Sequence, residues 1–261
     1  MPGTSRLLRV SEIPVAGLSV RDRDRMWQLY VEHYDNVSRL AFDRDLAEKT
    51  CVFLGRDVLT GEVGGFSTAR FYLHHSATRQ VGIYFSGDTI ILPRYWGEGG
   101  LHRAVMGAMA RWKLAHPRIP LYWHLICSGY RTYLTLARNF PVHWPHHERP
   151  TPPEIRELLH SVCRARYGDA WRADRGVIAV EGPQPVLKAA VAPFTPAVLA
   201  LPEVAFFVAA NPGYADGDEL AMLAPITPRA ILHMALRQMQ RRRPTASSST
   251  PRAQRAAEVT S

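Results

Sequence analysis

The stretch RYWGEGGLHRAVMGAMARW, residues 94–112, decides the fold assignment. It follows a short apolar run, TIILP at 89–93, and continues into a segment whose apolar side chains recur every three or four residues, as in a helix. The start of a helix has unpaired N–H donors and a partial positive charge, and glycines let an anion approach those donors closely. The junction therefore predicts an anion-binding loop. Its residues are Arg94, Gly97, Gly99 and Gly100.

Two common phosphate-binding motifs do not fit this loop. A P-loop has Lys followed by Ser or Thr after its last glycine, where this chain has Leu101 and His102. A dinucleotide-binding fingerprint has the spacing Gly-x-Gly-x-x-Gly near the start of a βαβ unit, which the glycines here do not match. The loop therefore predicts anion binding of another kind.

Hydrophobic spacing predicts the elements around the loop. The chain connecting the strand before the loop to the next strand contains a helix long enough for a crossover, so these two strands are expected to be parallel. The other strands form an antiparallel meander. The expected helices are 22–37, 43–49, 100–116 and 128–140, and the expected strands are 50–57, 62–75, 80–93 and 120–126.

This arrangement resembles the Gcn5-related N-acetyltransferase (GNAT) superfamily, whose motif Q/R-x-x-G-x-G/A is met by Arg94–Gly99. The resemblance covers about residues 6–145 and requires a first strand within 7–13. It implies an α+β fold with a mixed, mostly antiparallel sheet and a splayed parallel strand pair flanked by helices. The rest of the chain, which is more than such a core requires, is expected to add a C-terminal α/β extension. It also implies an acyl-CoA donor, with its pyrophosphate on the loop and its pantetheine arm between the splayed strands, and an amine acceptor.

Acyl transfer to an amine requires a base, an oxyanion donor and an acid for the leaving thiolate. The candidate bases are Asp88, which could equally be a turn or bulge residue, and His124, although a histidine on an apolar strand is more often a buried core residue. Backbone N–H groups near 89–92 are the expected oxyanion donors. The resemblance implies a tyrosine acid on helix 128–140, but its place falls on Thr135, so Tyr133 is the candidate instead.

Two other groups of residues suggest different chemistry. Cys127 ends a strand, where a nucleophile could act, although a buried thiol is the favoured interpretation. Three histidines lie in VHWPHHERP, residues 142–150, at positions 143, 146 and 147. Because prolines flank them, we expect an irregular surface loop and no metal.

The domain expectation is a GNAT-like acyl-CoA-binding core at 1–149, an extension packed on it at 150–243, and a disordered tail at 244–261. The extension is expected to contain a helix beginning near 151 and strands at 176–180 and 203–210. Its loop NPGYADGDE contains three acids that could attract an amine: Asp216, Asp218 and Glu219. A fainter likeness to N-acyl amino acid and acyl-homoserine-lactone synthases implies acyl carrier protein phosphopantetheine as another donor.

Charge and composition leave two alternatives to an enzyme open. Of the net charge of +9, six arginines and one glutamate from Arg237 onward supply +5, so most of the chain is nearly balanced. Nucleic-acid binding is therefore not favoured, and a non-catalytic GNAT-like module is the other alternative. Without an apolar segment of signal-peptide or membrane-span length, the chain is expected in the cytoplasm. The three cysteines at wide spacing indicate reduced thiols.

Overall fold

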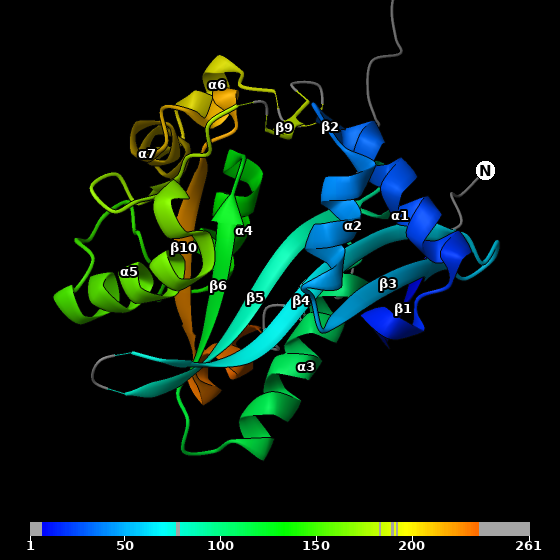
Figure 1. Ribbon diagram of the computed structural model, residues 1–261, viewed down its shortest axis with the longest axis horizontal. Coiled ribbons are helices and arrows are strands. Elements are labelled where there is room, and N and C mark those ends of the chain that lie inside the picture. The colour runs from blue at the N-terminus through cyan, green and yellow to red at the C-terminus, as the bar shows by residue number, and fades with distance from the viewer. Residues whose placement is uncertain (1–6, 77–78, 183, 189–190, 192, 235–261) are drawn as a thin grey trace, which may run out of the picture.

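The computed structural model describes residues 7–76, 79–182, 184–188, 191 and 193–234. Its main element is an eight-stranded sheet (Figure 1). The strands of this sheet are β1 (Leu8–Pro14), β3 (Cys51–Asp57), β4 (Val63–His75), β5 (Gln80–Ile91), β6 (Leu121–Cys127), β7 (Trp171–Arg172), β8 (Val177–Ile178) and β10 (Glu219–Ile226). A small second sheet pairs β2 (Tyr34–Asp35) with β9 (Val186–Leu187).

Helices cover both faces of the main sheet. They are α1 (Val20–His33), α2 (Arg39–Ala47), α3 (Gly100–Ala115), α4 (Tyr130–Asn139), α5 (Pro153–Tyr167), α6 (Pro196–Leu199) and α7 (Pro202–Ala210). Single 3₁₀ turns lie at η1 (Val15–Gly17), η2 (Pro93–Tyr95), η3 (Gly168–Ala170) and η4 (Tyr214–Asp216). None of the helices in the described ranges is both long and apolar enough to cross a membrane.

The sheet order is β1-β3-β4-β5-β6-β10-β8-β7. All neighbours are antiparallel except β5 and β6, which are parallel. The predicted fold class is therefore confirmed, including the parallel pair that a crossover helix requires. The last paired residues are Ser86 and Leu125, beyond which β5 and β6 diverge (Figure 1).

Alternating side chains divide the core by face, as strand geometry dictates. On β5, Tyr84 packs toward α3 and α4, whereas Phe85 belongs to the cluster under α5. Farther along the same strand, Ile90 packs under α1 and α2 with Met26 and Phe42. The first part of β5 therefore packs against α3, α4 and α5, and its last part packs against α1 and α2. The change occurs where β6 separates from β5.

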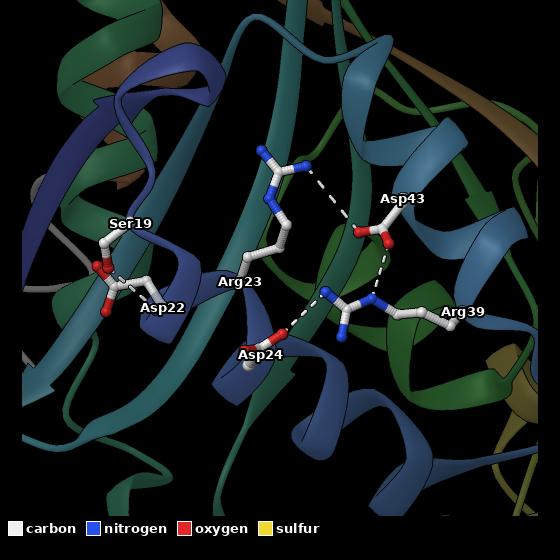
Figure 2. Close-up of polar contacts among 6 residues, drawn as sticks. All are labelled: Ser19, Asp22, Arg23, Asp24, Arg39 and Asp43. Atoms are coloured by element: carbon white, nitrogen blue, oxygen red, sulfur yellow. Dashed lines mark hydrogen bonds and ion pairs between the residues drawn. The ribbon is translucent and has the colours of Figure 1, made fainter.

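Ion pairs join α1 to α2 on the outside of the molecule. Figure 2 shows Arg39 between Asp24 at 2.9 Å and Asp43 at 2.7 Å, while Arg23 lies 3.9 Å from the other oxygen of Asp43. Single exposed pairs contribute little to stability, but several charges sharing one geometry hold it better. The network helps fix the orientation of α2 relative to α1, and both helices contribute to the cavity described below.

The C-terminal part completes the main sheet. β10 was not predicted, yet it lies inside the sheet and pairs with β6 along its whole length, from Leu220–Cys127 to Ile226–Leu121. The domain boundary expected at 149/150 therefore falls within one continuous sheet. The tail predicted for 244–261 lies outside the described residues.

The strand predicted at 203–210 is wrong, because this segment is helix α7. Pro202 occupies the first helical turn, where its missing N–H costs nothing. The fully buried residues Val204 and Phe207 lie three positions apart, which is helical spacing. The β-branched and aromatic composition misled the sequence prediction because tertiary packing decides such short apolar runs.

Candidate functional site

A β-bulge lies where β5 and β6 separate. In the ladder with β4, Ser67 faces Thr89 and Ala69 faces Ser86, so β5 has one extra residue between these pairs. Gly87 lies in this bulge, and a Cβ there would come within 2.4 Å of Thr68 Oγ1. No side chain fits at that position, which explains the glycine in the sequence SGDT.

A cavity of about 610 Å³ opens beside the bulge. Its walls come from α1, α2, β5, β6, α4, the chain near β9 and the start of β10. Aromatic rings and acidic groups share the lining. The acidic residues are Asp45, Asp88 and Glu219, and the aromatic ones are Tyr30, Tyr34, Phe42, Tyr84, Phe85, Trp96 and Trp123.

Asp88 faces this cavity from the bulge. Burial, together with the charges of Asp45 and Glu219, raises the pKa of its carboxyl to about 7, although the charge of Lys49 opposes the shift. A carboxyl with a pKa near neutrality can accept a proton at physiological pH and release it again.

Glu219 reaches the same cavity from the first residue of β10. Burial raises the pKa of its carboxyl to about 7, while the hydroxyl of Ser128 donates a 2.5 Å hydrogen bond to Oε1 and lowers it. Of the three acids expected to attract an amine, only Glu219 lines the cavity. Asp218 contacts Arg175 at 3.4 Å, and Asp216 is exposed.

A buried lysine, Lys49, packs against the bulge. The side chain of Lys49 is fully buried, and its Nζ lies 2.5 Å from Asp45 Oδ1 and 3.0 Å from the Asp45 carbonyl oxygen. Its Cε would lie 2.8 Å from a Cβ on Gly87. The ammonium is thus held against the backbone beside Asp88, so one fixed positive charge partly compensates the acids of the cavity.

Backbone N–H groups of β5 face the gap left by β6. The Leu92 N–H donates to the Gly64 carbonyl at 3.0 Å, so it is engaged with β4. Because N–H groups alternate in direction along an antiparallel ladder, those of Thr89 and Ile91 point the other way, toward the position that β6 has vacated. Within the stretch expected to supply oxyanion donors, these two N–H groups have the required direction.

The glycine loop adopts the conformation that its sequence demands. Gly97 has φ +89° and Gly99 has φ +67°, values that residues with a Cβ rarely adopt. Gly99 is the N-cap of α3 and provides no side chain to cap the first N–H groups. Glu98 turns away, because its Oε2 accepts the N–H of Leu8 at 2.9 Å. The start of α3 is therefore open to an anion.

A second cavity of about 400 Å³ lies over this loop. It is lined by Gly97, Gly99 and Gly100 together with the arginines Arg103 and Arg138. The two cavities adjoin, and four residues line both: Ile91, Leu101, His102 and Thr135. We call the two together the groove, with a glycine-loop end and a carboxylate end.

Arg94 does not line the groove within the described residues. Its guanidinium lies 5.0 Å from the ring centre of Tyr95, on the exposed side of η2. Arg103 takes the place that we expected for Arg94, with Nη1 donating to the Glu98 carbonyl at 2.8 Å. The spacing signal for Arg103 was present, since it follows the last glycine by three residues, one helical turn.

His124 and Tyr133 are not brought to the groove. His124 is fully buried on the α5 face of β6, 3.1 Å from the Met222 carbonyl, and burial lowers its pKa to about 4. Tyr133 is fully buried against α7, and its hydroxyl donates to the Pro145 carbonyl at 3.4 Å. Of the three residues proposed from the sequence for proton transfer, Asp88 alone lines the groove.

Two further expectations concern Cys127 and the histidine loop. Cys127 is buried, its Sγ lies 3.2 Å from Met222 Sδ, and burial raises its pKa, so it lacks the properties of a reactive thiol. The surface position predicted for residues 142–150 is wrong for two of the histidines. His143 and His146 are only 1% and 8% exposed, because the loop packs into the core beside α4.

Similarity to known proteins is found among solved structures. No family model and no curated protein sequence matches the chain. A GCN5-related N-acetyltransferase from Kribbella flavida is similar over 86% of this chain and 65% of its own, with 11% identity and a TM-score of 0.38. A probable N-acyltransferase from Enterococcus faecalis matches over 51% of this chain, with 16% identity and a TM-score of 0.38. This chain covers 32% of the Enterococcus protein.

A GNAT family N-acetyltransferase from Escherichia coli, solved with CoA, is similar over 56% of this chain and 79% of its own. Its identity is 13% and its TM-score 0.35. The Kribbella and Escherichia coli structures are described as GNAT N-acetyltransferases, and the Enterococcus structure as a probable N-acyltransferase. Because the TM-scores lie below 0.5, the function proposed below depends on the groove's own residues.

Proposed function

We propose that this protein is an N-acyltransferase that moves an acyl group from acyl-CoA to a small-molecule amine. The observation that carries the proposal is the groove itself. Open helix N–H donors lie at one end, two carboxyls with pKa values near 7 lie at the other, and strand N–H groups without a strand partner point into it between them.

The glycine-loop end suits the pyrophosphate of CoA. Bare backbone at Gly97 and Gly99 allows a phosphate to approach the first N–H groups of α3, and the helix dipole adds a favourable partial charge. Arg103 lines the same cavity and supplies a cation. The pantetheine arm would then run past Ile91 and Leu101, which line both cavities, toward the separation of β5 and β6.

The carboxylate end suits an amine that arrives as an ammonium ion. Asp88 accepts one proton from it, and the resulting amine nitrogen attacks the thioester carbonyl carbon to form a C–N bond. The N–H groups of Thr89 and Ile91 stabilise the oxyanion of the tetrahedral intermediate. The C–S bond then breaks, and the CoA thiolate leaves and takes a proton from protonated Asp88 or from solvent. The amide nitrogen loses its remaining extra proton to Glu219 or solvent.

The choice of CoA over acyl carrier protein follows from the number of phosphates. Phosphopantetheine on a carrier protein has one phosphate, whereas CoA has a pyrophosphate that can occupy several donors at once. A loop with two left-handed glycines before an open helix provides several donors. We therefore propose CoA as the donor and treat the acylated carrier protein as the second arm of the test.

The test is a product screen with the purified full-length chain. Acetyl-, octanoyl- and palmitoyl-CoA, and the corresponding acylated carrier protein, are each incubated with a set of primary amines. Release of free thiol and the mass of the amide product are measured, with Asp88→Asn as the inactive control. Binding of acyl-CoA without any product would favour the non-catalytic module, and binding of neither donor by calorimetry would overturn the proposal.

A further inference from the structure

The loop between α4 and α5 is anchored to the main sheet. Trp144 exchanges two backbone hydrogen bonds of 2.8 Å with Leu223 of β10, and its ring packs into the cluster under α5. The residues on either side of Trp144 are therefore held at the edge of β10. This anchoring brings His143 and His146 into the protein interior and leaves His147 partly buried.

One ring nitrogen from each of His143, His146 and His147 lies within 4.8 Å of the other two. The rings of His143 and His146 are 4.5 Å apart, and those of His146 and His147 stack at 4.7 Å. None of the three lines either cavity of the groove. The cluster is thus a separate feature that the proposed acyl transfer does not use.

Two of the three rings each have a buried nitrogen with no hydrogen-bond partner: His143 Nε2 and His147 Nδ1. Buried polar atoms in proteins nearly always have a partner, so such atoms require an explanation. A neutral imidazole offers a lone pair, and that is the form that binds metal.

The opposite nitrogens have the partners that metal-bound histidines usually have. His143 Nδ1 donates to the Phe140 carbonyl at 2.7 Å, which leaves the lone pair on its unpartnered Nε2. His147 Nε2 lies 3.8 Å from a carboxylate oxygen of Glu148, on the other side of the ring from its unpartnered Nδ1. Such carbonyl and carboxylate partners fix the tautomer and orientation of a metal ligand.

His146 differs from the other two because its Nδ1 accepts the N–H of Glu148 at 3.0 Å. A cation would compete with that N–H for the same lone pair. The ring of His146 lies between those of His143 and His147 and is only 8% exposed. Because this ring is already inside the protein, it could coordinate a cation after a small shift, without a change of side-chain rotamer from the surface to the interior. Tetrahedral coordination at about 2.0–2.1 Å requires nitrogens about 3.3 Å apart, which is a modest contraction of the cluster.

We propose that His143, His146 and His147 form a binding site for a Zn²⁺ ion. The site supplies three imidazole ligands and leaves the fourth tetrahedral position to water. Its ion would cross-link residues 143–147 within the loop that Trp144 attaches to β10. This assignment departs from our expectation from the sequence, in which the same histidines lay on the surface without a metal.

The test uses the full-length protein, stripped with a chelator and then dialysed with one equivalent of Zn²⁺ against metal-free buffer. Metal content is measured by mass spectrometry, the dissociation constant by competition with a chelating dye, and the melting temperature with and without Zn²⁺. The variant is His147→Gln, whose side chain is the least buried of the three. His116→Gln is the matched control, because His116 Nδ1 also contacts a backbone carbonyl, that of Trp112, at 3.0 Å.

We expect the wild type and His116→Gln to retain about one equivalent, with a melting temperature several degrees higher than that of the stripped protein. His147→Gln should lose affinity by about tenfold or more. Co²⁺ provides a readout that needs no variant, because tetrahedral coordination gives intense visible absorption and octahedral surface binding does not. Equal retention by the wild type and His147→Gln, equal loss in His116→Gln, or a weak octahedral Co²⁺ spectrum would each overturn the site.

Discussion

The two ends of the groove hold their charges in different ways. At the glycine-loop end the binding groups are backbone N–H donors at the start of α3, made accessible by Gly97 and Gly99. At the carboxylate end they are side chains: Asp88 of β5 and Glu219 of β10 both line the large cavity. One end is made by a continuous stretch of chain, and the other by tertiary packing.

The difference determines how each end responds to mutation. A backbone site is altered mainly by adding atoms, because no side chain performs the binding. A carboxylate site is altered by removing a charge or by changing the charges around it, since its pKa depends on burial and on neighbours. Each prediction below changes one end and leaves the other intact.

The largest effect is expected from Asp88→Asn. The amide keeps the shape of the side chain but cannot accept a proton, so kcat/KM for acyl transfer should fall by about 10² to 10⁴-fold. The Kd for acyl-CoA should stay unchanged, because the glycine loop is intact. Steady-state thiol release and calorimetry measure the two quantities. Asp24→Asn is the control, an equivalent change on α1 at a half-exposed carboxylate paired with Arg39. Full activity in Asp88→Asn would exclude this residue as the base.

The next effect concerns Gly99→Val. Valine at φ +67° is strained and places its branches before the first turn of α3, so the Kd for CoA should rise about 10- to 150-fold, the equivalent of a lost charge-assisted hydrogen bond. Gly61→Val is the matched control. Gly61 has φ +72° and open space around it, but lies in the turn between β3 and β4. The melting temperature should fall by a similar amount in both variants, whereas the affinity for CoA should fall only in Gly99→Val. Equal affinities would place the anion elsewhere.

A smaller effect separates the two arginines of the loop region. Arg103 lines the cavity over the glycines, so Arg103→Ala should weaken CoA binding by about tenfold, as expected for one contact to a charged group. Arg94 stacks on Tyr95 outside the groove, so Arg94→Ala should leave the Kd within twofold. Calorimetry on the two variants measures this contrast. The reverse order would mean that the loop rearranges when CoA binds.

The smallest effect is a shift of the pH profile. Asp88 acts as a base only when deprotonated, so kcat/KM should rise with pH through about 7. The charge of Asp45 raises the pKa of both Asp88 and Glu219. Asp45→Asn should therefore move the rising limb to lower pH and increase activity at pH 6 relative to pH 8. If the rising part of the pH profile were the same in Asp45→Asn as in the wild type, the observed pKa would belong to another group.

The same contrast explains what the sequence could predict. The glycine loop could be predicted from the sequence because its signals follow one another within twenty residues: a strand, the glycines and the start of a helix. The parallel pairing of β5 and β6 followed from the length of the connection between them. Asp88 could be predicted as a candidate because it is a charged residue in a largely apolar strand.

The rest depends on contacts that no local pattern records. Lys49 reads as the end of a short surface helix, yet it is fully buried against the bulge. Glu219 was noted as an acid in a turn, but its position beside Asp88 follows only from the insertion of β10 next to β6. Tyr133 was chosen by helical position, and packing against α7, itself mistaken for a strand, directs it away from the groove.

The position of β10 has a consequence for synthesis on the ribosome. β6 and its helical neighbours leave the exit tunnel long before residues 219–226, which must then add to the edge of β6 inside the sheet. Until that moment the edge of β6 is uncovered and Glu219 is absent from the groove. A nascent chain that stops short of β10 would thus expose a strand edge on which another chain could pair, and it would lack one of the two carboxyls.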